Sequence, residues 1–187
     1  PSIISHAFAT GIVGASLFGR AERWRVACVA AACSMLPDLD VVGFRFGIAY
    51  EDMWGHRGLS HSLAFAALIA ALATILLFRG ARWRPLRLRV FLLLFAATAS
   101  HGLLDAMTDG GLGVAFFAPY DTERYFLPFR PIEVSPIGVK RFLSERGLRI
   151  LANEGVWIWL PATLLSVTLF ALGSLFRSSK KSDPASS

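Results

Sequence analysis

The sequence predicts an all-α membrane protein with about five transmembrane or membrane-embedded helices and a loop region at the outer membrane face. Of its 187 residues, 55% are hydrophobic and only 17% are charged, whereas soluble globular chains have roughly 25% charged residues. Residues 61–78 and 156–176 contain no acidic or basic group except His61, and each approaches or exceeds the roughly 18 apolar residues that cross a bilayer. Three further apolar stretches carry isolated polar residues, at 3–19, 24–44 and 90–108.

Length and composition predict one membrane-embedded domain over residues 1–176, followed by a basic, polar tail at 177–187 that we expect to be cytoplasmic and disordered. The first apolar stretch has no basic residues before it and no small-residue cleavage pattern after it, so we expect it to be retained. The spacing of Cys28 and Cys33 matches neither a zinc knuckle nor a redox pair. We expect both to be small buried apolar residues.

The first two helices each carry polar residues at one end. His6 lies at the start of the first, and a lone histidine there is typical of interfacial packing as well as of a metal ligand. In the second, Pro37 disfavours a helical conformation at Leu36, which predicts a break or kink that places Asp38 and Asp40 on a turn. The alternative for these aspartates is a polar helix end that touches lipid headgroups.

The third helix, at 61–78, follows a short histidine-rich segment. His56 and His61 are five residues apart, or about 140° on a helix, so they cannot share one helical face. We therefore expect His56 on the preceding loop, Ser60 as the helix cap, and His61 in the first turn. Arg57 between them is a candidate clamp for a phosphate or a transition state, and the alternative is an arginine that binds headgroups.

The fourth helix, at 90–108, carries His101 and Asp105 four residues apart, which places them one turn apart on one face. Such a pair can hold one ion, and the alternative is a structural bond between an imidazole and a carboxylate. The glycines at 110 and 111 end this helix, so Asp109 is predicted to support the pair or to contact substrate.

The loop at 109–155 precedes the fifth helix, at 156–176, and mixes glycine, proline, aromatic and charged residues. One interpretation is an interfacial lid in which Arg124 and Arg130 face an anionic substrate. The other is an aromatic belt with arginines that extend to the headgroups.

Charge sets the orientation. The segments that follow the first, third and fifth helices carry 11 basic and two acidic residues, and the remaining, longer connections carry eight basic and 11 acidic residues. Because lysine and arginine are enriched on the cytoplasmic side, the N-terminus and all the histidine and aspartate motifs are predicted outside, and the C-terminus inside. This topology and contact with anionic lipids explain the pI near 10.0. Nucleic-acid binding is not expected.

Histidine and aspartate are costly beside a hydrocarbon layer, and neutral imidazole with carboxylate is a donor set that divalent metals accept. The motifs therefore predict a metal site at the outer face. The predicted ligands are His6, Asp38, Asp40, His56, His61, His101 and Asp105, and the residues predicted to act in catalysis are Asp38, Asp40, Arg57 and Asp109.

These motifs, in this order, resemble the YdjM-like family of inner-membrane, LexA-regulated, metal-dependent hydrolases. The resemblance rests on His6, Leu-Pro-Asp-Leu-Asp at 36–40, Gly-His-Arg-Gly-Leu-Ser-His-Ser at 55–62, Ser-His-Gly-Leu-Leu-Asp at 100–105 and Pro-Ile-Glu-Val-Ser-Pro-Ile-Gly at 131–138. It implies a membrane-bound, zinc-dependent hydrolase. A fainter similarity to zinc-dependent phospholipases C implies phosphoester cleavage, although this chain lacks the downstream histidines that complete a three-metal site in those enzymes.

The resulting hypothesis is hydrolysis of a lipid or headgroup phosphoester at the outer face, with one or two zinc ions held by His61, His101, Asp105 and Asp38. The three other predicted ligands would complete the set, and an aspartate left unligated would act as general base. A non-catalytic metal-binding membrane protein, structural or sensory, is the alternative. A transporter is less favoured, because the third and fifth helices offer almost no polar residues and the arginine-rich side has no histidine.

Overall fold

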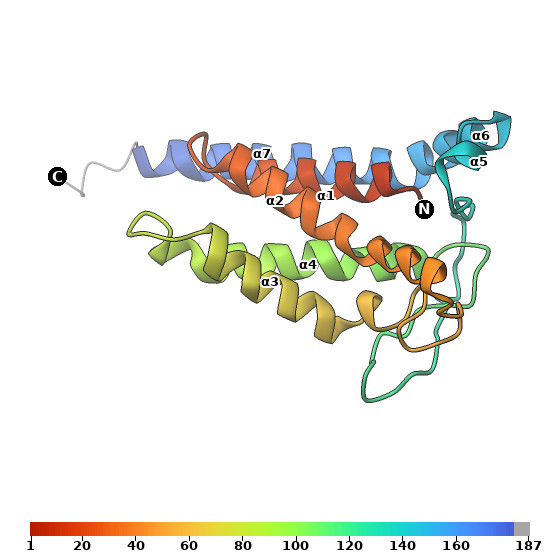
Figure 1. Cartoon of the computed structure of the whole chain (residues 1–187). Coiled ribbons are helices and arrows are strands. Elements are labelled where there is room, and N and C mark those ends of the chain that lie inside the picture. Colours follow the sequence, from red (N-terminus) through yellow and green to blue (C-terminus); the bar gives the residue numbers. More distant parts are fainter. Residues whose placement is uncertain (182–187) are drawn as a thin grey trace.

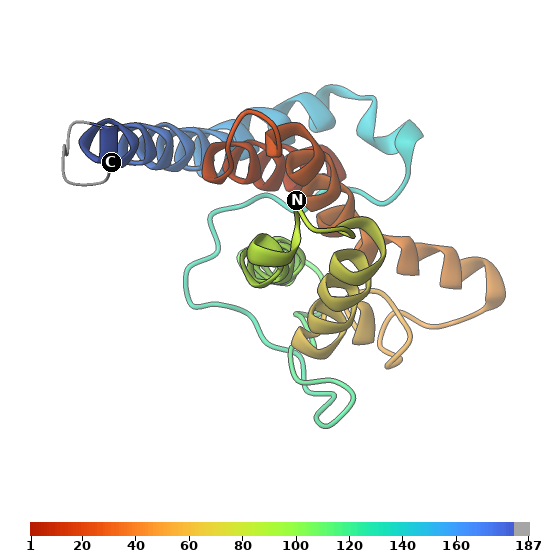
Figure 2. The ribbon, with the colours of Figure 1, turned by 90° about the vertical axis from the view of Figure 1, so that its left-hand side faces the viewer.

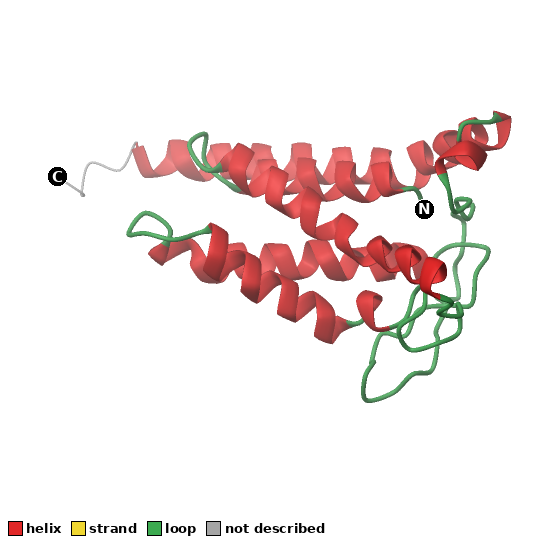
Figure 3. Cartoon of the chain, in the orientation of Figure 1, coloured by secondary structure: helices red, strands yellow, loops and turns green. Residues whose placement is uncertain are grey.

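The computed structural model describes the backbone of residues 1–181 and the side chains of residues 1–138 and 141–175. Within this part of the chain all regular structure is helical, apart from two isolated β-bridges, Thr108–Ile132 and Val114–Tyr125. Five long helices form a bundle, with the loops gathered mainly at one end (Figures 1 and 3). The predicted fold class is confirmed.

The helices fall into two groups, which lie apart in the view of Figure 2, where α4 is seen nearly along its axis and α7 runs across the picture. One group contains α1, α2 and α7, in which α1 packs on both partners, and the other is the α3–α4 pair, which joins the first through α2. The α-helices are α1 (Ile3–Leu17), α2 (Arg23–Met35), α3 (Leu63–Leu77), α4 (Arg87–Ala106), α5 (Val139–Phe142), α6 (Glu145–Glu154) and α7 (Leu160–Lys181). The tighter or wider turns are η1 (Leu36–Phe46), η2 (Leu59–His61), η3 (Arg84–Leu86) and the π-helical η4 (Gly155–Trp159).

Within the described part of the chain, three continuous helical segments are long and apolar enough to cross a membrane: Arg23–Phe46, Arg84–Ala106 and Glu145–Leu175. The other two apolar helices, α1 and α3, have 15 residues each, or about 22 Å of helix, which is shorter than a hydrocarbon layer of about 30 Å. Both pack against longer helices, which keeps the polar residues near their N-termini, such as His6 and His61, at the loop end of the bundle. The backbones of α1 and α2 approach closely because Gly11 and Gly14 face Ala27 and Ala30.

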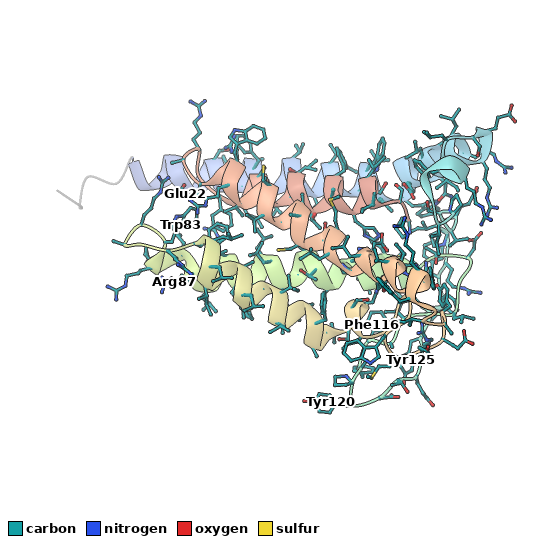
Figure 4. All side chains as sticks on the ribbon, in the orientation of Figure 1. Glu22, Trp83, Arg87, Phe116, Tyr120 and Tyr125 are labelled. Carbon is teal, nitrogen blue, oxygen red and sulfur yellow. The ribbon has the colours of Figure 1, made fainter. Side chains whose placement is uncertain are left out.

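The two ends of the bundle differ in charge and packing. The α1–α2 and α3–α4 turns and the end of α7 lie at one end, and the N-terminus and the long loops lie at the other (Figure 1). At the first end, labelled by Glu22, Trp83 and Arg87 in Figure 4, Arg82 pairs with Glu22 at 2.7 Å. Arg25 and Arg89 donate hydrogen bonds to carbonyls at the ends of α3 and α1. The basic residues thus cap helix C-termini there.

Three local expectations are wrong. Leu36 keeps helical dihedrals, with φ −59° and ψ −38°, so Pro37 changes the α-helix into the 3₁₀ helix η1 instead of breaking it. The cap of α3 is Ser62, whose hydroxyl accepts from the Phe65 amide at 3.1 Å, because Ser60 and His61 belong to the preceding 3₁₀ turn and not to the helix start. Cys33 is buried as expected, whereas Cys28 is exposed.

Candidate metal centre

Four side chains from three segments converge at the loop end of the bundle. Asp38 comes from η1, His61 from η2, and His101 and Asp105 from α4, and one ligand atom of each lies within 4.8 Å of the others. His61 Nε2 is 3.3 Å from Asp105 Oδ2 and 3.9 Å from Asp38 Oδ1. His101 Nε2 is 3.3 Å from Asp38 Oδ1 and 3.8 Å from Asp105 Oδ2. We call these four residues the donor group.

These spacings suit one small divalent ion. Four donors at zinc distances in a tetrahedron lie about 3.4 Å apart, so two of the measured pairs fit directly and two are within about half an ångström. Among the described residues, the Nε2 atoms of His61 and His101 are buried and have no hydrogen-bond partner. Because buried polar atoms are normally satisfied, this pattern indicates that the donor group can hold a metal.

Hydrogen bonds at the other ring nitrogens orient both imidazoles. His101 Nδ1 lies 2.6 Å from the Ser34 carbonyl, which can only accept, so the ring donates there and its Nε2 lone pair faces the donor group. His61 Nδ1 lies 2.9 Å from Ser60 Oγ and 3.2 Å from Asp40 Oδ2. Fixing the outer nitrogen by a carbonyl or a carboxylate is the usual arrangement behind a metal-bound histidine.

Asp40 lies behind the donor group and connects several of its supports. Its carboxylate accepts from Ser60 Oγ at 2.5 Å and from the Arg57 amide at 3.2 Å, and it lies 2.7 Å from His56 Nδ1. Asp40, His56 and His61 also form a second cluster with metal-ligand spacing. Because hydrogen bonds already engage the nitrogens that these histidines turn toward Asp40, this cluster is better suited to positioning His61 than to a second ion.

His6 lies on the other side of the donor group. Its ring stacks on that of His101, with centroids 3.6 Å apart, and its Nε2 is 3.9 Å from Asp105 Oδ1. The side chain is buried, and neither ring nitrogen has a hydrogen-bond partner among the described residues. His6 therefore stands at the edge of the donor group, close enough to join it after a small movement.

Arg57 is directed inward and not toward solvent. Its guanidinium Nε lies 3.0 Å from Asp105 Oδ2, its NH1 donates to the Gly110 carbonyl at 2.9 Å, and the side chain is only 3% exposed. The residue has a left-handed backbone with φ +65°, a conformation that is uncommon outside glycine. The ion pair holds the Asp105 carboxylate.

The other predicted site residues lie outside the donor group. Asp109 accepts a hydrogen bond from the Val134 amide at 2.8 Å and ties the end of α4 to the following loop. Arg124 donates to the carbonyls of His56 and Tyr50, at 2.9 and 3.0 Å, so it joins two loops. Arg130 lies over the Phe126 ring, 4.5 Å from its centroid. Phe116, Tyr120 and Tyr125 mark this loop region in Figure 4.

Sequence patterns did not indicate three residues that support the site. Ser34 contributes a backbone carbonyl, which no side-chain motif reveals, and Ser60 links His61 to Asp40 instead of capping a helix. Glu154, at the end of α6, is fully buried and accepts from Ser2 Oγ and Ser5 Oγ at 2.5 Å each. Its position directly before an apolar helix was the available signal, because a carboxylate there requires partners.

The surroundings of His61 are strongly negative. Burial alone would lower the pKa of this imidazole, but the nearby carboxylates of Asp105 and Asp40 raise its pKa to about 9. The ring thus sits between two buried anionic groups. An environment that favours a positive charge at this position also favours a cation bound to the donor group.

Comparisons with known proteins extend over the helices and the site. A sequence profile of the YdjM inner membrane protein family matches residues 3–178. Inner membrane protein YbcI of Escherichia coli (strain K12) is 38% identical over 166 residues, which cover 88% of this chain and 94% of YbcI. No solved structure matches the chain. The chain therefore belongs to the YdjM inner membrane protein family.

Proposed function

We propose that this protein is a membrane-bound, metal-dependent hydrolase that cleaves a lipid or headgroup phosphoester at the outer face of the cytoplasmic membrane, with zinc as the metal. The convergence of two unpartnered Nε2 atoms and two carboxylates at one end of a membrane bundle carries this proposal. Imidazole and carboxylate without thiolate is the donor set typical of hydrolytic zinc sites, whereas structural zinc sites are rich in cysteine.

The residues divide into roles by their contacts. A bound divalent ion supplies Lewis acidity, which lowers the pKa of water and polarises a phosphoryl oxygen. Asp38 has a side chain 21% exposed, against 0–4% for the rest of the donor group, so solvent and substrate approach at this carboxylate. We assign Asp38 the role of general base, which leaves His61, His101 and Asp105 as the three metal ligands of the hydrolase. Asp40 holds His61 in place, and Arg57 holds Asp105. His6 is an additional ligand at the edge of the donor group.

The proposed orientation places the N-terminus and the donor group outside and the C-terminus in the cytoplasm. The arginine-rich turns lie at the bundle end opposite to the donor group (Figure 1), and positive residues favour the cytoplasmic side. The donor group would then lie at the level of the outer headgroups, where phosphoester bonds of lipids are found. Membrane lipids are accordingly the proposed partners.

A non-catalytic metal site is the second candidate, and one observation favours it. Four protein donors fill a tetrahedron, whereas catalytic zinc keeps one position for water. Zinc-edge X-ray absorption of the purified protein separates the two. A shell of four protein ligands without an exchangeable oxygen would favour the structural or sensory site, and a water ligand or a fifth position would favour the hydrolase.

Metal analysis tests the site. Wild-type protein purified in detergent is expected to carry about one zinc ion per chain, since the donor group is built for one. His101→Ala and Asp105→Ala each remove a donor and should lose most of it. Asp109→Asn is the matched control, because this aspartate lies at the same bundle end outside the donor group. Equal zinc content in all four proteins would exclude the site as drawn.

Activity is tested on phospholipid vesicles that contain the reconstituted protein. Release of a phosphorylated headgroup or of lipid phosphate should stop when a chelator removes the metal and resume when zinc is restored. His101→Ala should lack the activity at zinc concentrations that restore it in the wild type. A lipid phosphodiesterase activity that a chelator leaves unchanged would contradict the metal-dependent mechanism.

A further inference from the structure

A cavity of about 350 Å³ runs between α1, α4 and α7, beside the donor group, and falls in the size range of ligand pockets. We propose that this groove binds one acyl chain of a bilayer lipid, whose polar end then lies at the metal centre. The second part of this inference rests on the proposed function and names its substrate class, a lipid that carries a long acyl chain. Its walls include Val13, Leu93, Ala97, Leu104, Ile158 and Leu165.

The chemistry of the walls selects an apolar occupant. Of the lining residues, Thr10 and Ser100 are the two with hydroxyl groups. Thr10 donates to the His6 carbonyl and Ser100 to the Ala97 carbonyl, both at 2.8 Å, so neither hydroxyl needs a ligand as acceptor. The indole of Trp157 adds one N–H donor to the walls. A polar metabolite or a headgroup would therefore lose most of its hydration in this groove for few new hydrogen bonds, whereas a hydrocarbon chain has no such bonds to lose.

The groove begins at the donor group. On α4, the lining residues Ser100 and Leu104 directly precede His101 and Asp105. On α1, Thr10 follows His6 by one helical turn and bonds to its carbonyl. A chain in the groove therefore starts within one turn of the metal ligands. Because the headgroup is covalently linked to that acyl chain, it then lies at the metal centre.

The length of the groove matches one leaflet. Along α4 its lining extends from Leu93 to Leu104, which are 11 residues apart, or about 16 Å of helix. Half of a hydrocarbon layer of about 30 Å is about 15 Å. The groove thus fits the extended chain of one lipid in the leaflet nearest to the donor group.

A second, larger groove of about 630 Å³ lies between α1, α2 and α7 and provides a control. It reaches Arg23 and Trp24, near the basic end of the bundle, and no residue of α4 lines it. Lipid in that groove would fill the surface of the bundle, but it would have no defined relation to His101 or Asp105.

Photocrosslinking tests the proposal on the full chain in nanodiscs of phosphatidylethanolamine and phosphatidylglycerol, with a trace of phosphatidylglycerol that carries a diazirine midway along one acyl chain. After irradiation, labelled peptides are mapped by mass spectrometry. We expect labelling of residues 96–104 and 157–165 to exceed, several-fold, that of Leu68 and Ile75, which are exposed on α3. Equal labelling of all three regions would reduce the groove to ordinary lipid contact and overturn the proposal.

Variants that fill the groove make the test specific. Ala96 and Ala162 line the groove and are not buried, so Ala96→Phe and Ala162→Phe should leave the helix packing intact. The added side-chain volume should cause a several-fold loss of groove labelling. Ala15→Phe in the larger groove is the matched control and should keep wild-type labelling. If a phenylalanine variant elutes as aggregate, Ala162→Leu replaces it. Wild-type labelling in the filled variants would also overturn the proposal.

Zinc content and phosphodiesterase activity are measured on the same samples. Filled variants should keep zinc but lose activity on long-chain lipid more than on a short-chain, soluble analogue. A protein without zinc or activity that still shows groove labelling would refute the proposed function and leave the lipid groove standing. The two failures are therefore distinguishable.

Discussion

Asp40→Asn separates support of the centre from direct ligation. The Asp40 carboxylate accepts from Ser60 at 2.5 Å and lies 2.7 Å from His56, and it orients His61 through both contacts. Asparagine keeps the shape but replaces one accepting oxygen with an amide that can only donate, and it removes the charge. The donor atoms of the donor group remain in place. Metal binding should therefore weaken without being lost.

The size of the effect follows from this position behind the ligands. Replacing an outer partner of a metal-bound histidine typically lowers metal affinity by about 10–100-fold, which corresponds to about 1.4–2.7 kcal/mol. Asp105→Asn changes a donor atom itself and also leaves the buried Arg57 guanidinium without its carboxylate, 3.0 Å away. We expect it to reduce zinc affinity more than Asp40→Asn does.

Competition with a chromophoric zinc chelator measures both affinities on protein purified in detergent. Glu51→Gln is the control, because this exposed carboxylate lies in the same loop region and outside both clusters. The expected order of affinity is wild type and Glu51→Gln first, then Asp40→Asn, then Asp105→Asn. Wild-type affinity in Asp40→Asn would refute its supporting role, and a loss equal to that of Asp105→Asn would make Asp40 a ligand.

Three further predictions follow from single contacts. Gly111→Ala and Gly80→Ala both place alanine at φ near +90° and should each lower the free energy of unfolding by about 1–2 kcal/mol. Gly111→Ala should also lower zinc affinity, because its Cβ would lie 2.6 Å from Arg57 NH1, whereas a Cβ at Gly80 meets open space. Equal zinc affinities of the two variants would refute this. Glu154→Gln should lower the free energy of unfolding by about 1–3 kcal/mol, because a buried acceptor of two serine hydroxyls becomes partly a donor. An unchanged melting temperature would contradict a stabilising role for the bonds from Glu154 to Ser2 and Ser5. Saturating zinc at 100 times its Kd should stabilise the folded protein by about 2.7 kcal/mol in a thermal melt, and a chelator should reverse the shift.

The fold was predictable because hydropathy alone identifies apolar helices. Each of the five expected segments overlaps one of the five long helices, with differences of a few residues at most ends. The local errors arose where short-range geometry decides. Leu36 remains helical because η1 changes to the tighter 3₁₀ form, and Ser62 caps α3 because the turn at Leu59–His61 takes up Ser60. Neither choice leaves a signal in residue type or spacing.

That the motifs gather at one bundle end was predictable from charge. The basic segments alone predicted which end is cytoplasmic, and the histidine motifs, which were not part of that count, all fell at the opposite end. Which residues touch was not predictable. A one-dimensional pattern treats Asp40 and Asp105 alike, but η1 directs Asp40 toward His56, and α4 directs Asp105 toward His61. Asp109 resembled both, yet the turn after α4 carries it to the Val134 amide.

The charges of the buried cluster identify the kind of ion that it suits. Asp38, Asp40 and Asp105 contribute three negative charges. Arg57 and the Pro1 amine, which lies 3.3 Å from Asp105 Oδ1, contribute two positive charges, so with neutral imidazoles the cluster keeps a net charge of −1. A buried excess of that size is costly unless a counter-charge sits within it. The raised pKa of His61 expresses the same excess as affinity for a proton. A single cation at the unpartnered Nε2 atoms offsets this negative excess, whereas two divalent ions would far outweigh it. Electroneutrality therefore favours one ion in the donor group, with Asp40 and His56 as its supports.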